Sequence, residues 1–387
     1  MLQMLASSSG TSARHTVVEE YPFLRIWING RYVAIEKILQ ETEHPHSPFE
    51  QATFQFIKEW LSGQDNNFQL TTSGSTGPPK SISVTRGQMI SSAMRTAERL
   101  QLQKNSTALL CIDPKYIGGK MMLVRSLVLG MRIMAVDPTA NPLIKIPVDK
   151  CVQFTAFVPY QVRRILESKH PHLLNSPDKI LIGGAPLDAA IREQLDKYQC
   201  QCYETYGMTE TVSHIALRLV NTQMKQQYFE ALPGVAISKD ERGCLVVRAD
   251  YLAGPVITND IVEIIEPDKF VWLGRWDSVI NTGGVKVMPE KVEQHLEEIF
   301  HRHNFQHRFF IAALPDEHLG NKIVLILEGV QFSSEILNKS LEGLKSVVSP
   351  YEVPKEVYSI PNFITTETLK IDRNQTLAGV TLLSSLK

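Results

Sequence analysis

Residues 71–80 read TTSGSTGPPK, and they overlap the end of FQLTT, a short segment expected to form a β-strand. Glycines in this stretch let backbone N–H groups approach an anion, hydroxyl side chains add donors, and Lys80 adds positive charge. A Walker A loop has glycine directly before its lysine, whereas Pro78 and Pro79 stand there in this chain. An ordinary Ser/Gly turn is the alternative, but it leaves so dense a run of donors unexplained. The stretch therefore predicts a phosphate-binding loop with these contact residues: Thr72, Ser73, Gly74, Ser75, Thr76, Gly77 and Lys80.

Strands and helices alternate on the C-terminal side of this loop. Thr85-Arg86-Gly87-Gln88 is typical of a capping box and predicts a helix that ends near Leu100. Further strands are expected at ALLCI, RIMAV, FTAFVP and KILIGG, and further helices at residues 119–129, at 160–168 and from Asp188 toward Tyr198. Such alternation predicts a mostly parallel sheet covered by helices, in which ligands bind beyond the carboxyl ends of the strands.

Two elements are expected before the loop. YPFLRIWING and RYVAI are predicted to pair as strands through a turn at Asn29-Gly30. Ser47-Pro48-Phe49-Glu50 has the form of a capping box with proline at the first helical position, and Gly63 is expected to end that helix.

The pattern changes near residue 275. Short strands are expected before it at GCLVVRA, PVITNDIVEII and KFVWLG. After it come a helix opened by Pro289, the strands RFFIAALP and KIVLILEG, and a helix at residues 334–346. We therefore expect an α/β protein with a large N-terminal ATP- and acid-binding domain at residues 1–276. A small, mobile α+β C-terminal lid domain is expected at residues 277–387.

Composition excludes several classes of function. The net charge is −1, so no global field favours nucleic acid or an anionic membrane. No apolar run approaches the roughly 20 residues that span a bilayer, and the N-terminal residues do not resemble a secretory signal. The five cysteines include no C-x-x-C pair, which predicts a reduced, cytoplasmic setting. Oligomeric state is left open.

Residues 203–210, YETYGMTE, carry groups suited to a nucleotide. A ring such as Tyr206 can stack on a base, a hydroxyl such as Thr209 can hold a phosphate, and a carboxylate such as Glu210 can bind Mg²⁺. A buried tyrosine followed by a helix start is the structural alternative. The turn at residues 183–186, GGAP, is a weaker signal, since any tight turn could have this sequence.

These motifs, in this order, resemble those of the adenylate-forming superfamily, which contains acyl- and aryl-CoA synthetases, luciferases and adenylation domains of peptide synthetases. The resemblance covers residues 70–373. The strings LIGGAPL, YGMTET, WLGR and VINTGGVKVMPEKVE are most similar to the o-succinylbenzoate–CoA ligases of menaquinone synthesis. The resemblance implies an acid–thiol ligase that forms an acyl-adenylate with ATP and Mg²⁺ and then transfers the acyl group to coenzyme A.

The resemblance also assigns roles to individual residues. Asp260, in Thr258-Asn259-Asp260, matches the aspartate that accepts both ribose hydroxyls, Arg275 matches an arginine that reaches ribose or phosphate, and Asp277 falls on the hinge position. Lys370, in TLKIDR, matches the catalytic lysine that bonds the attacking carboxylate and the α-phosphate. The remaining implied residues are Thr209 and Glu210 in catalysis, Glu210 at the metal, Gly184, Ala185, Pro186, Glu204, Thr205, Tyr206 and Gly207 at the nucleotide, and Tyr116, Gly183 and His214 at the acid pocket.

Several positions depart from the family pattern. Tyr116 stands at or beside the usual gating histidine, Asn259 and Leu369 replace glycines, and only 70 residues precede the phosphate loop. Other aryl- or fatty-acid ligases and carrier-loading adenylation enzymes therefore stay open as alternatives. So does a non-catalytic nucleotide- or acyl-binding relative, although such a binder has no need of Lys370.

Two further groups of residues predict structure more than chemistry. The histidines of the segment at residues 301–307 have no spaced carboxylate or cysteine, so we expect a solvated helix end and no metal site. Cys200 and Cys202 are expected to point to opposite sides of a short strand, which favours packing.

Overall fold

A computed structural model of the chain describes residues 25–63, 66–71, 81–365 and 371–378. The chain divides into two compact units, each described by itself. Unit 1 holds residues up to Leu187, together with Ile191–Ile237 and Val247–Val256. Unit 2 holds Asp188–Ala190, Ser238–Val246 and the chain from Ile257 onward. The boundary expected between residues 276 and 277 stays a prediction.

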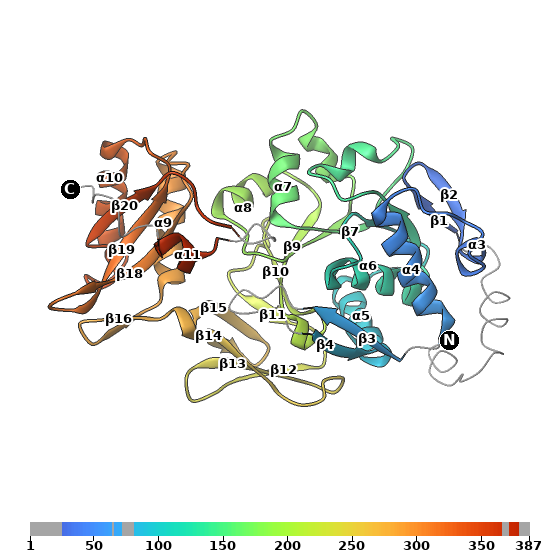
Figure 1. Ribbon diagram of the computed structural model, residues 1–387, viewed down its shortest axis with the longest axis horizontal. Helices are drawn as coiled ribbons and strands as arrows, with labels where there is room; N and C mark the ends of the chain where they lie inside the picture. The colour runs from blue at the N-terminus through green and yellow to red at the C-terminus, as the bar shows by residue number, and fades with distance from the viewer. Residues whose placement is uncertain (1–24, 64–65, 72–80, 366–370, 379–387) are drawn as a thin grey trace. The chain divides into compact units, whose positions relative to one another are not determined.

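Unit 1 is built on a twisted sheet whose strands run in the order β11-β10-β9-β8-β7-β5-β6-β1-β2 (Figure 1). Neighbours from β9 through β1 pair in parallel, while β2, β10 and β11 are antiparallel additions at the two ends. The strands are β1 (Arg25–Ile28), β2 (Arg31–Ala34), β5 (Thr107–Leu110), β6 (Arg132–Ala135), β7 (Phe154–Phe157), β8 (Lys179–Ile182), β9 (Gln201–Gly207), β10 (His214–Leu219) and β11 (Phe229–Ala231). The predicted α/β class with a mostly parallel sheet is confirmed.

Helices connect these strands as the alternating pattern requires. They are α3 (Ile35–Leu39), α4 (Pro48–Ser62), α5 (Arg86–Leu100), α6 (Ile117–Leu129), α7 (Pro159–Leu166) and α8 (Ala189–Leu195), with 3-10 turns η1 (Pro142–Lys145), η2 (Pro171–Asn175) and η3 (Thr209–Thr211). Thr85 and Gln88 form the predicted capping box of α5, and Gly63 ends α4 with φ +68°. One apolar cluster packs side chains of β5, β7 and β8, among them Leu109, against Val162 and Ile165 of α7.

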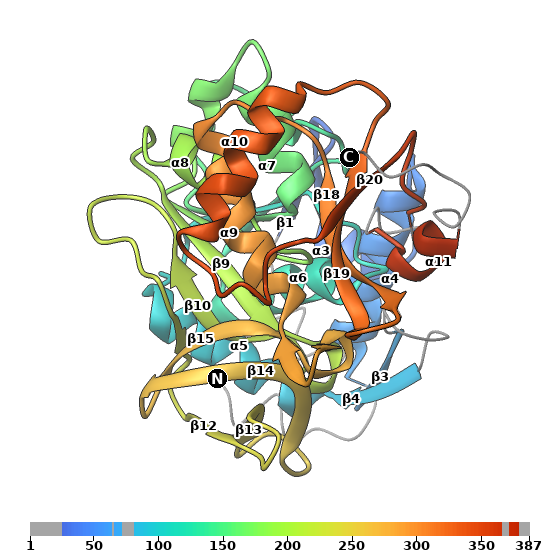
Figure 2. The ribbon, with the colours of Figure 1, turned by 90° about the vertical axis from the view of Figure 1, so that its left-hand side faces the viewer.

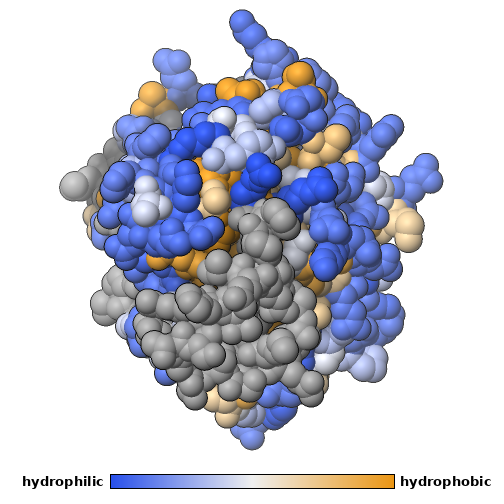
Figure 3. All heavy atoms as spheres, turned by 90° about the vertical axis from the view of Figure 1, so that its right-hand side faces the viewer, coloured by the Kyte–Doolittle hydropathy of each residue, from blue (hydrophilic) through white to orange (hydrophobic). Residues whose placement is uncertain are grey.

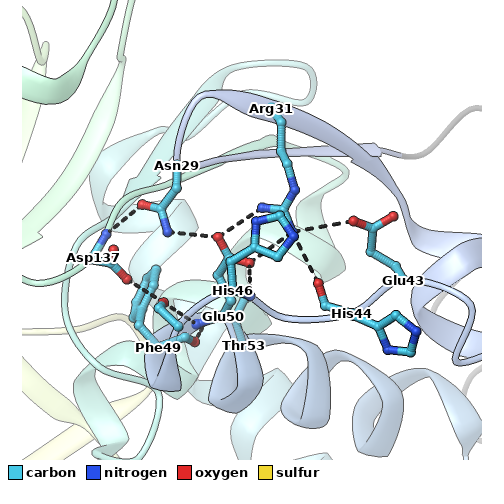
Figure 4. A network of polar contacts seen from close by, with 10 residues as sticks. Asn29, Arg31, Glu43, His44, His46, Phe49, Glu50, Thr53 and Asp137 are labelled. Carbon is cyan, nitrogen blue, oxygen red and sulfur yellow. Dashed lines mark hydrogen bonds and ion pairs between the residues drawn. The ribbon is translucent and has the colours of Figure 1, made fainter.

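The N-terminal hairpin is fixed to α4 by a buried carboxylate (Figure 4). Glu50 accepts hydrogen bonds from Asn29 Nδ2 at 2.9 Å, from both Nη atoms of Arg31 at 2.9 Å, and from the backbone N–H of His46 at 2.8 Å. The hydroxyl of Ser47 accepts from the backbone N–H of Glu50, which is one half of the expected capping box, while the carboxylate of Glu50 bonds the N–H of His46 in place of that of Ser47. Glu50 lies in α4 and its carboxylate bonds Asn29 and Arg31 of the hairpin, so it fixes the turn at Asn29 against the helix.

The strand before the glycine-rich stretch lies outside the parallel sheet. β3 (Asn67–Thr71) pairs antiparallel with β4 (Ser81–Thr85) in a sheet of its own, with Leu70 opposite Ile82 and Thr71 opposite Ser81. Residues 72–80 therefore connect two strands of a hairpin. The strand expected at FQLTT is confirmed as β3, but it belongs to this separate sheet and not to the parallel one. Phe68 and Leu70 of β3 and Val84 of β4 are all buried, so these alternate positions form the apolar face of the hairpin.

Unit 2 contains a sandwich around the three-stranded sheet β18-β19-β20 (Figure 2). On one face, Ile311, Leu325 and Leu327 pack with apolar residues of α9 and α10. On the other face, Phe310, Ala312, Val324 and Ile326 pack with Phe363 and with Leu377 of α11. The elements are β18 (Phe309–Asp316), β19 (Gly320–Glu328), β20 (Glu356–Ile360), α9 (Pro289–Arg302), α10 (Ser334–Lys345) and α11 (Arg373–Ala378).

Six further strands in the described part of the chain precede this sandwich. They are β12 (Val235–Lys239), β13 (Cys244–Ala249), β14 (Val256–Glu266), β15 (Lys269–Arg275), β16 (Ile280–Thr282) and β17 (Val285–Val287), with η4 at Trp276–Ser278. β14 and β15 form an antiparallel pair, and so do β16 and β17.

The described surface on the face drawn in Figure 3 is mostly hydrophilic. Within the described ranges, no helix combines the length and the apolar character needed to cross a bilayer. No group of three metal-ligating side chains gathers in the same ranges. In the histidine-rich segment, His303 bonds Ser340 Oγ at 2.8 Å and His307 packs against Phe305 and Phe332. Those two rings therefore have structural partners.

Candidate active site

Three sequence-predicted segments meet at one edge of the unit 1 sheet. β5, β7 and β8 are parallel neighbours, so the turns that follow them lie at the same edge. These turns lead to Tyr116, to Pro159 and to Gly183-Gly184. Tyr116 is the N-cap residue of α6, and 60% of its surface is exposed. Its role as the gate of an acid pocket stays a prediction.

The turn at residues 183–186 needs its glycines. A Cβ on Gly183 would lie 2.1 Å from Oγ1 of Thr205, and Gly184 has φ +91°. The hydroxyl of Thr205 thus lies directly against the backbone of the turn. Two residues predicted from separate motifs, Gly183 and Thr205, are therefore brought together by β8 and β9.

Glu204 holds the end of the same turn. Its carboxylate is buried, accepts the backbone N–H of Leu187 at 3.1 Å and forms ion pairs with Arg218 and, at 3.8 Å, with Arg192. Both carboxylate oxygens of Glu204 therefore have protein partners. In this structure the residue positions the turn after Pro186, and its predicted contact with the nucleotide stays a prediction.

The end of β9 and the start of β10 approach each other closely. A Cβ on Gly207 would lie 2.4 Å from both Cα of His214 and the carbonyl oxygen of Ser213, so only glycine fits. The ring of Tyr206 lies 5.7 Å from that of Phe229 and keeps part of its surface exposed. A partly exposed aromatic ring of this kind offers a face on which a base can stack.

The η3 turn carries the polar residues of this motif. Thr211 ties the turn by accepting from the backbone N–H of Met208 at 3.1 Å and donating to the carbonyl of Ser213 at 2.8 Å. Thr209 is half-buried, whereas Glu210 is exposed, and no described residue donates a hydrogen bond to its carboxylate. Such a carboxylate suits a hard cation such as Mg²⁺, which prefers oxygen ligands.

Backbone strain sits directly after this turn. Val212 is buried and has φ +71°, a conformation that β-branched residues rarely adopt. Strain of this kind persists where the surrounding structure imposes it and often marks functional sites. Here it sets the direction in which the chain presents Ser213 and His214.

His214 forms a buried polar cluster with α5 and α6. Its Nε2 lies 3.0 Å from Oγ1 of Thr96, whose hydroxyl donates to the carbonyl of Ser92. Nε2 must therefore carry the proton, which leaves Nδ1 as an acceptor facing Nη2 of Arg125 at 3.5 Å and Oγ of Ser213 at 3.5 Å. Burial and the charge of Arg125 lower the pKa of His214 well below 6.5, so its ring is neutral.

Arg125, which the sequence-based prediction missed, is the central residue of this cluster. It is 2% exposed and donates to Ser213 Oγ at 3.1 Å, but no described carboxylate pairs with it and its Nε has no partner among the described residues. Burial lowers the pKa of Arg125 to about 9, so the side chain stays charged at neutral pH. A buried cation without a carboxylate partner among the described residues is costly, and an anionic ligand would offset that cost. The available signal was one arginine inside the apolar run MMLVRSLVL.

In unit 2, Asp260 and Arg275 stand opposite each other on β14 and β15. Arg275 donates from Nε and Nη2 to the two carboxylate oxygens of Asp277, both at 2.8 Å, and these bonds lower the pKa of Asp277. Arg242 donates to Oδ1 of Asn259 at 2.9 Å. Asn259, which replaces the usual glycine, thus has a partner of its own, and Asp260 keeps its place on the strand.

The phosphate-loop residues Thr72, Ser73, Gly74, Ser75, Thr76, Gly77 and Lys80, and also Lys370, lie outside the described residues. The segment with Lys370 is flanked by an antiparallel bridge between Thr365 and Ile371. Just beyond it, Arg373 pairs with Glu293 at 2.8 Å, and burial raises the pKa of Glu293. The residues that flank this segment are therefore held by the bridge between Thr365 and Ile371 and by the ion pair of Arg373 with Glu293.

Comparison with known proteins gives the family. Residues 23–242, more than half of the chain, match the family described as AMP-binding enzyme. The chain therefore belongs to the AMP-binding enzyme family. A structure of an acyl-CoA synthetase (AMP-forming)/AMP-acid ligase II-like protein from Dyadobacter fermentans is 38% identical, with a TM-score of 0.59, over 88% of this chain and 97% of that one.

Other relatives are more distant. A 2-succinylbenzoate--CoA ligase of Haemophilus influenzae is 24% identical over 79% of this chain and 68% of its own length. The o-succinylbenzoate CoA synthetase of Bacillus subtilis, in complex with its acyl-adenylate intermediate, has a TM-score of 0.74 at 15% identity, over 94% of this chain and 97% of that one, and supports the fold alone. The family match, the 38% identical structure and the Haemophilus influenzae relative place the chain among the AMP-forming acyl-CoA ligases.

Proposed function

We propose that this chain is an o-succinylbenzoate–CoA ligase. The observation that carries the proposal is Arg125, a buried cation beside His214 that lacks a carboxylate partner among the described residues. o-Succinylbenzoate has two carboxylates, so one can be activated while the other pairs with a buried guanidinium. A monocarboxylic benzoate or fatty acid would leave that charge unpaired. The names of the distant relatives support the same substrate.

The first half-reaction joins the acid to AMP. A carboxylate oxygen attacks the α-phosphorus of ATP, the bond to the bridging oxygen breaks, and pyrophosphate leaves. The turn at residues 184–186 and Tyr206 bind the adenine, Asp260 and Arg275 bind the ribose side, and residues 72–80 bind the phosphates. Glu210 would hold Mg²⁺, which would neutralise phosphate charge. Lys370 places positive charge beside the attacking carboxylate and the α-phosphate.

The second half-reaction transfers the acyl group. The thiolate of coenzyme A attacks the acyl carbon, the acyl–phosphate bond breaks, and AMP leaves. The domain at residues 277–387 rotates about Asp277 between the two steps, so that it presents a different face to the active site in each half-reaction. In the present structure Arg275 donates two hydrogen bonds to Asp277. Rotation of the domain about Asp277 would break these bonds, and Arg275 is also proposed to bind the nucleotide.

A pyrophosphate-release assay with a panel of acids tests the proposal. We expect release with ATP and o-succinylbenzoate, formation of AMP and not ADP, and a CoA thioester when coenzyme A is added. Benzoate, a fatty acid and succinate serve as single-carboxylate or non-aromatic comparisons. Release with benzoate or a fatty acid, and none with o-succinylbenzoate, would overturn the substrate. Binding of ATP without release by any acid would favour a non-catalytic relative, and acylation of a carrier protein in place of coenzyme A would favour a carrier-loading enzyme.

A further inference from the structure

Two thiols face each other where the chain enters β9: Cys200 directly precedes the strand and Cys202 lies in it. The Sγ atoms of Cys200 and Cys202 are 3.6 Å apart. The expectation that they point to opposite sides is wrong, because residues two apart on a strand project from the same face. Cys200 is 4% exposed and Cys202 is fully buried. The two sulfur atoms therefore form one buried pair.

The backbone of this pair is held by Asn221. Its Oδ1 accepts from the backbone N–H of Cys202 at 2.9 Å, and its Nδ2 donates to the carbonyl of Cys200 at 2.7 Å. The amide thus bonds the backbone on both sides of Gln201 and fixes the positions of the two cysteines. Because Asn221 is itself fully buried, the approach of the two sulfur atoms is part of the packed structure.

The other cysteines have different surroundings. Cys111 is buried against Thr155, with the two side chains 3.8 Å apart, and burial raises its pKa to about 12. Cys244 is buried and Cys151 is exposed. All five cysteines fall within the described ranges, and there only Cys200 and Cys202 have a second sulfur within hydrogen-bonding distance. The pair is therefore distinct from isolated core cysteines.

We propose that Cys200 and Cys202 are a redox-active dithiol, which a hydroperoxide oxidises to a reversible intramolecular disulfide. The thiolate of Cys200 attacks one oxygen of the hydroperoxide, the O–O bond breaks, and water or an alcohol leaves after protonation, which forms a sulfenic acid. Cys202 then attacks the sulfur of Cys200, the S–O bond breaks, and water leaves. The two thiols are oxidised by two electrons and the hydroperoxide is reduced by two.

The geometry assigns Cys200 as the attacking thiol. Cys200 keeps 4% of its surface exposed, whereas Cys202 is fully buried, so a small hydroperoxide meets Cys200 first. The S–H of Cys202 directed at the sulfur of Cys200 lowers the pKa of Cys200 and raises that of Cys202. Cys202 is therefore the resolving thiol.

The two cysteines are close enough for this bond to form. Two residues of fully extended chain span about 6.6 Å, which lies inside the range of Cα separations of about 4.4–6.8 Å that disulfides adopt. The sulfur atoms must move from 3.6 Å to about 2.05 Å. Thiol–disulfide exchange reverses such a bond, so we expect an excess of a thiol reductant to restore both cysteines.

The experiment uses the full chain with Cys151→Ser, which removes the exposed thiol. After treatment with hydrogen peroxide, remaining thiols are alkylated under denaturing conditions and the protein is weighed by mass spectrometry. We expect the loss of two hydrogen atoms, two thiols protected from alkylation, and a peptide that contains both cysteines in the linked form. Dithiothreitol should restore the original mass.

Two variants in the Cys151→Ser background test separately the attacking thiol and the resolving thiol. With Cys202→Ser, we expect Cys200 to gain one oxygen and to be trapped by dimedone. With Cys200→Ser, Cys202 should stay reduced at the same peroxide dose. Thermal denaturation verifies that each variant is folded. The proposal is overturned if the pair stays reduced in the folded parent while Cys111 or Cys244 oxidises, or if the mass loss persists in either variant.

Discussion

Nη2 of Arg125 lies 3.5 Å from Nδ1 of His214, in a buried cluster where no described carboxylate balances the charge. The imidazole is neutral because Nε2 bonds Thr96 and because burial and Arg125 lower its pKa. A neutral acceptor orients the guanidinium without neutralising it. The charged guanidinium and the neutral ring of this cluster are the basis of the first two predictions.

Arg125→Gln should weaken use of the acid while leaving ATP binding unchanged. A hydrogen bond to a charged group contributes about 1.5–3 kcal/mol, so we expect kcat/KM for o-succinylbenzoate to fall about 10- to 100-fold. The KM for ATP should stay within about twofold of the parent, because the nucleotide is proposed to bind elsewhere. Arg132→Gln, at an exposed position of β6, is the matched control. A proportional rise of the KM for ATP in Arg125→Gln would argue for a general structural role.

His214 should make the protein less stable as the pH falls. Its folded-state pKa is well below 6.5, so the unfolded chain binds more protons in the interval between the two values. The free energy of unfolding should therefore decrease below about pH 6.5, with a limiting slope of about 1.36 kcal/mol per pH unit. Urea denaturation between pH 7 and pH 5 measures this, and His214→Gln should flatten the profile. An unchanged profile in His214→Gln, or equal flattening in the exposed variant His172→Gln, would contradict the assignment.

Gly207→Ala should disrupt the junction of β9 and β10. The new methyl group would lie 2.4 Å from Cα of His214 and from the carbonyl oxygen of Ser213, and both are backbone atoms that cannot rotate away. Overpacking of this kind costs about 1–3 kcal/mol, which differential scanning calorimetry resolves. Gly87→Ala, in α5, is the matched control, because its Cβ would meet Thr85 Oγ1 only at 3.9 Å. Because Gly87 is the second residue of α5 and not in the helix interior, this substitution should change the stability of the chain little. Equal melting temperatures for the two variants would show that the junction is looser than described.

Local features of the fold could be predicted from the sequence, because the residues that determine them are neighbours along the chain. The turn at Asn29-Gly30 and the capping box from Thr85 to Gln88 are of this kind. The hairpin of β3 and β4 was missed because its pairing joins segments on either side of residues 72–80. Arg125 was missed for a related reason: its meaning depends on burial and on absent partners, and no local pattern encodes either. Glu204 was predicted as a nucleotide contact, but its bonds to Leu187 and Arg218 could not be predicted, because these partners lie elsewhere in the sequence.

The loss of stability caused by Gly183→Ala should be partly reversed by a second substitution at Thr205. Gly183→Ala places a methyl group 2.1 Å from Oγ1 of Thr205, so the single variant should lose stability by about 1–3 kcal/mol. Thr205→Ala alone removes a half-buried side chain and should cost less. In the double variant the clash is absent, so the coupling energy should be favourable by at least about 1 kcal/mol in a double-mutant cycle. Additive losses would mean that the turn moves away from β9 to accept the methyl group.

Lys370→Ala should separate the two half-reactions. A lysine that stabilises charge at the α-phosphate acts in adenylation alone, and removing one such group costs about 100- to 1,000-fold in rate. We expect pyrophosphate release to fall by that factor, while ATP binding by calorimetry and thiolysis of supplied acyl-adenylate stay near the parent values. Lys339→Ala, at an exposed position of α10, is the control for loss of a lysine. If Lys370→Ala impaired all three steps equally, its effect would be structural. If it impaired none, the adenylation step would need another cation, and the proposed function would lose its catalytic centre.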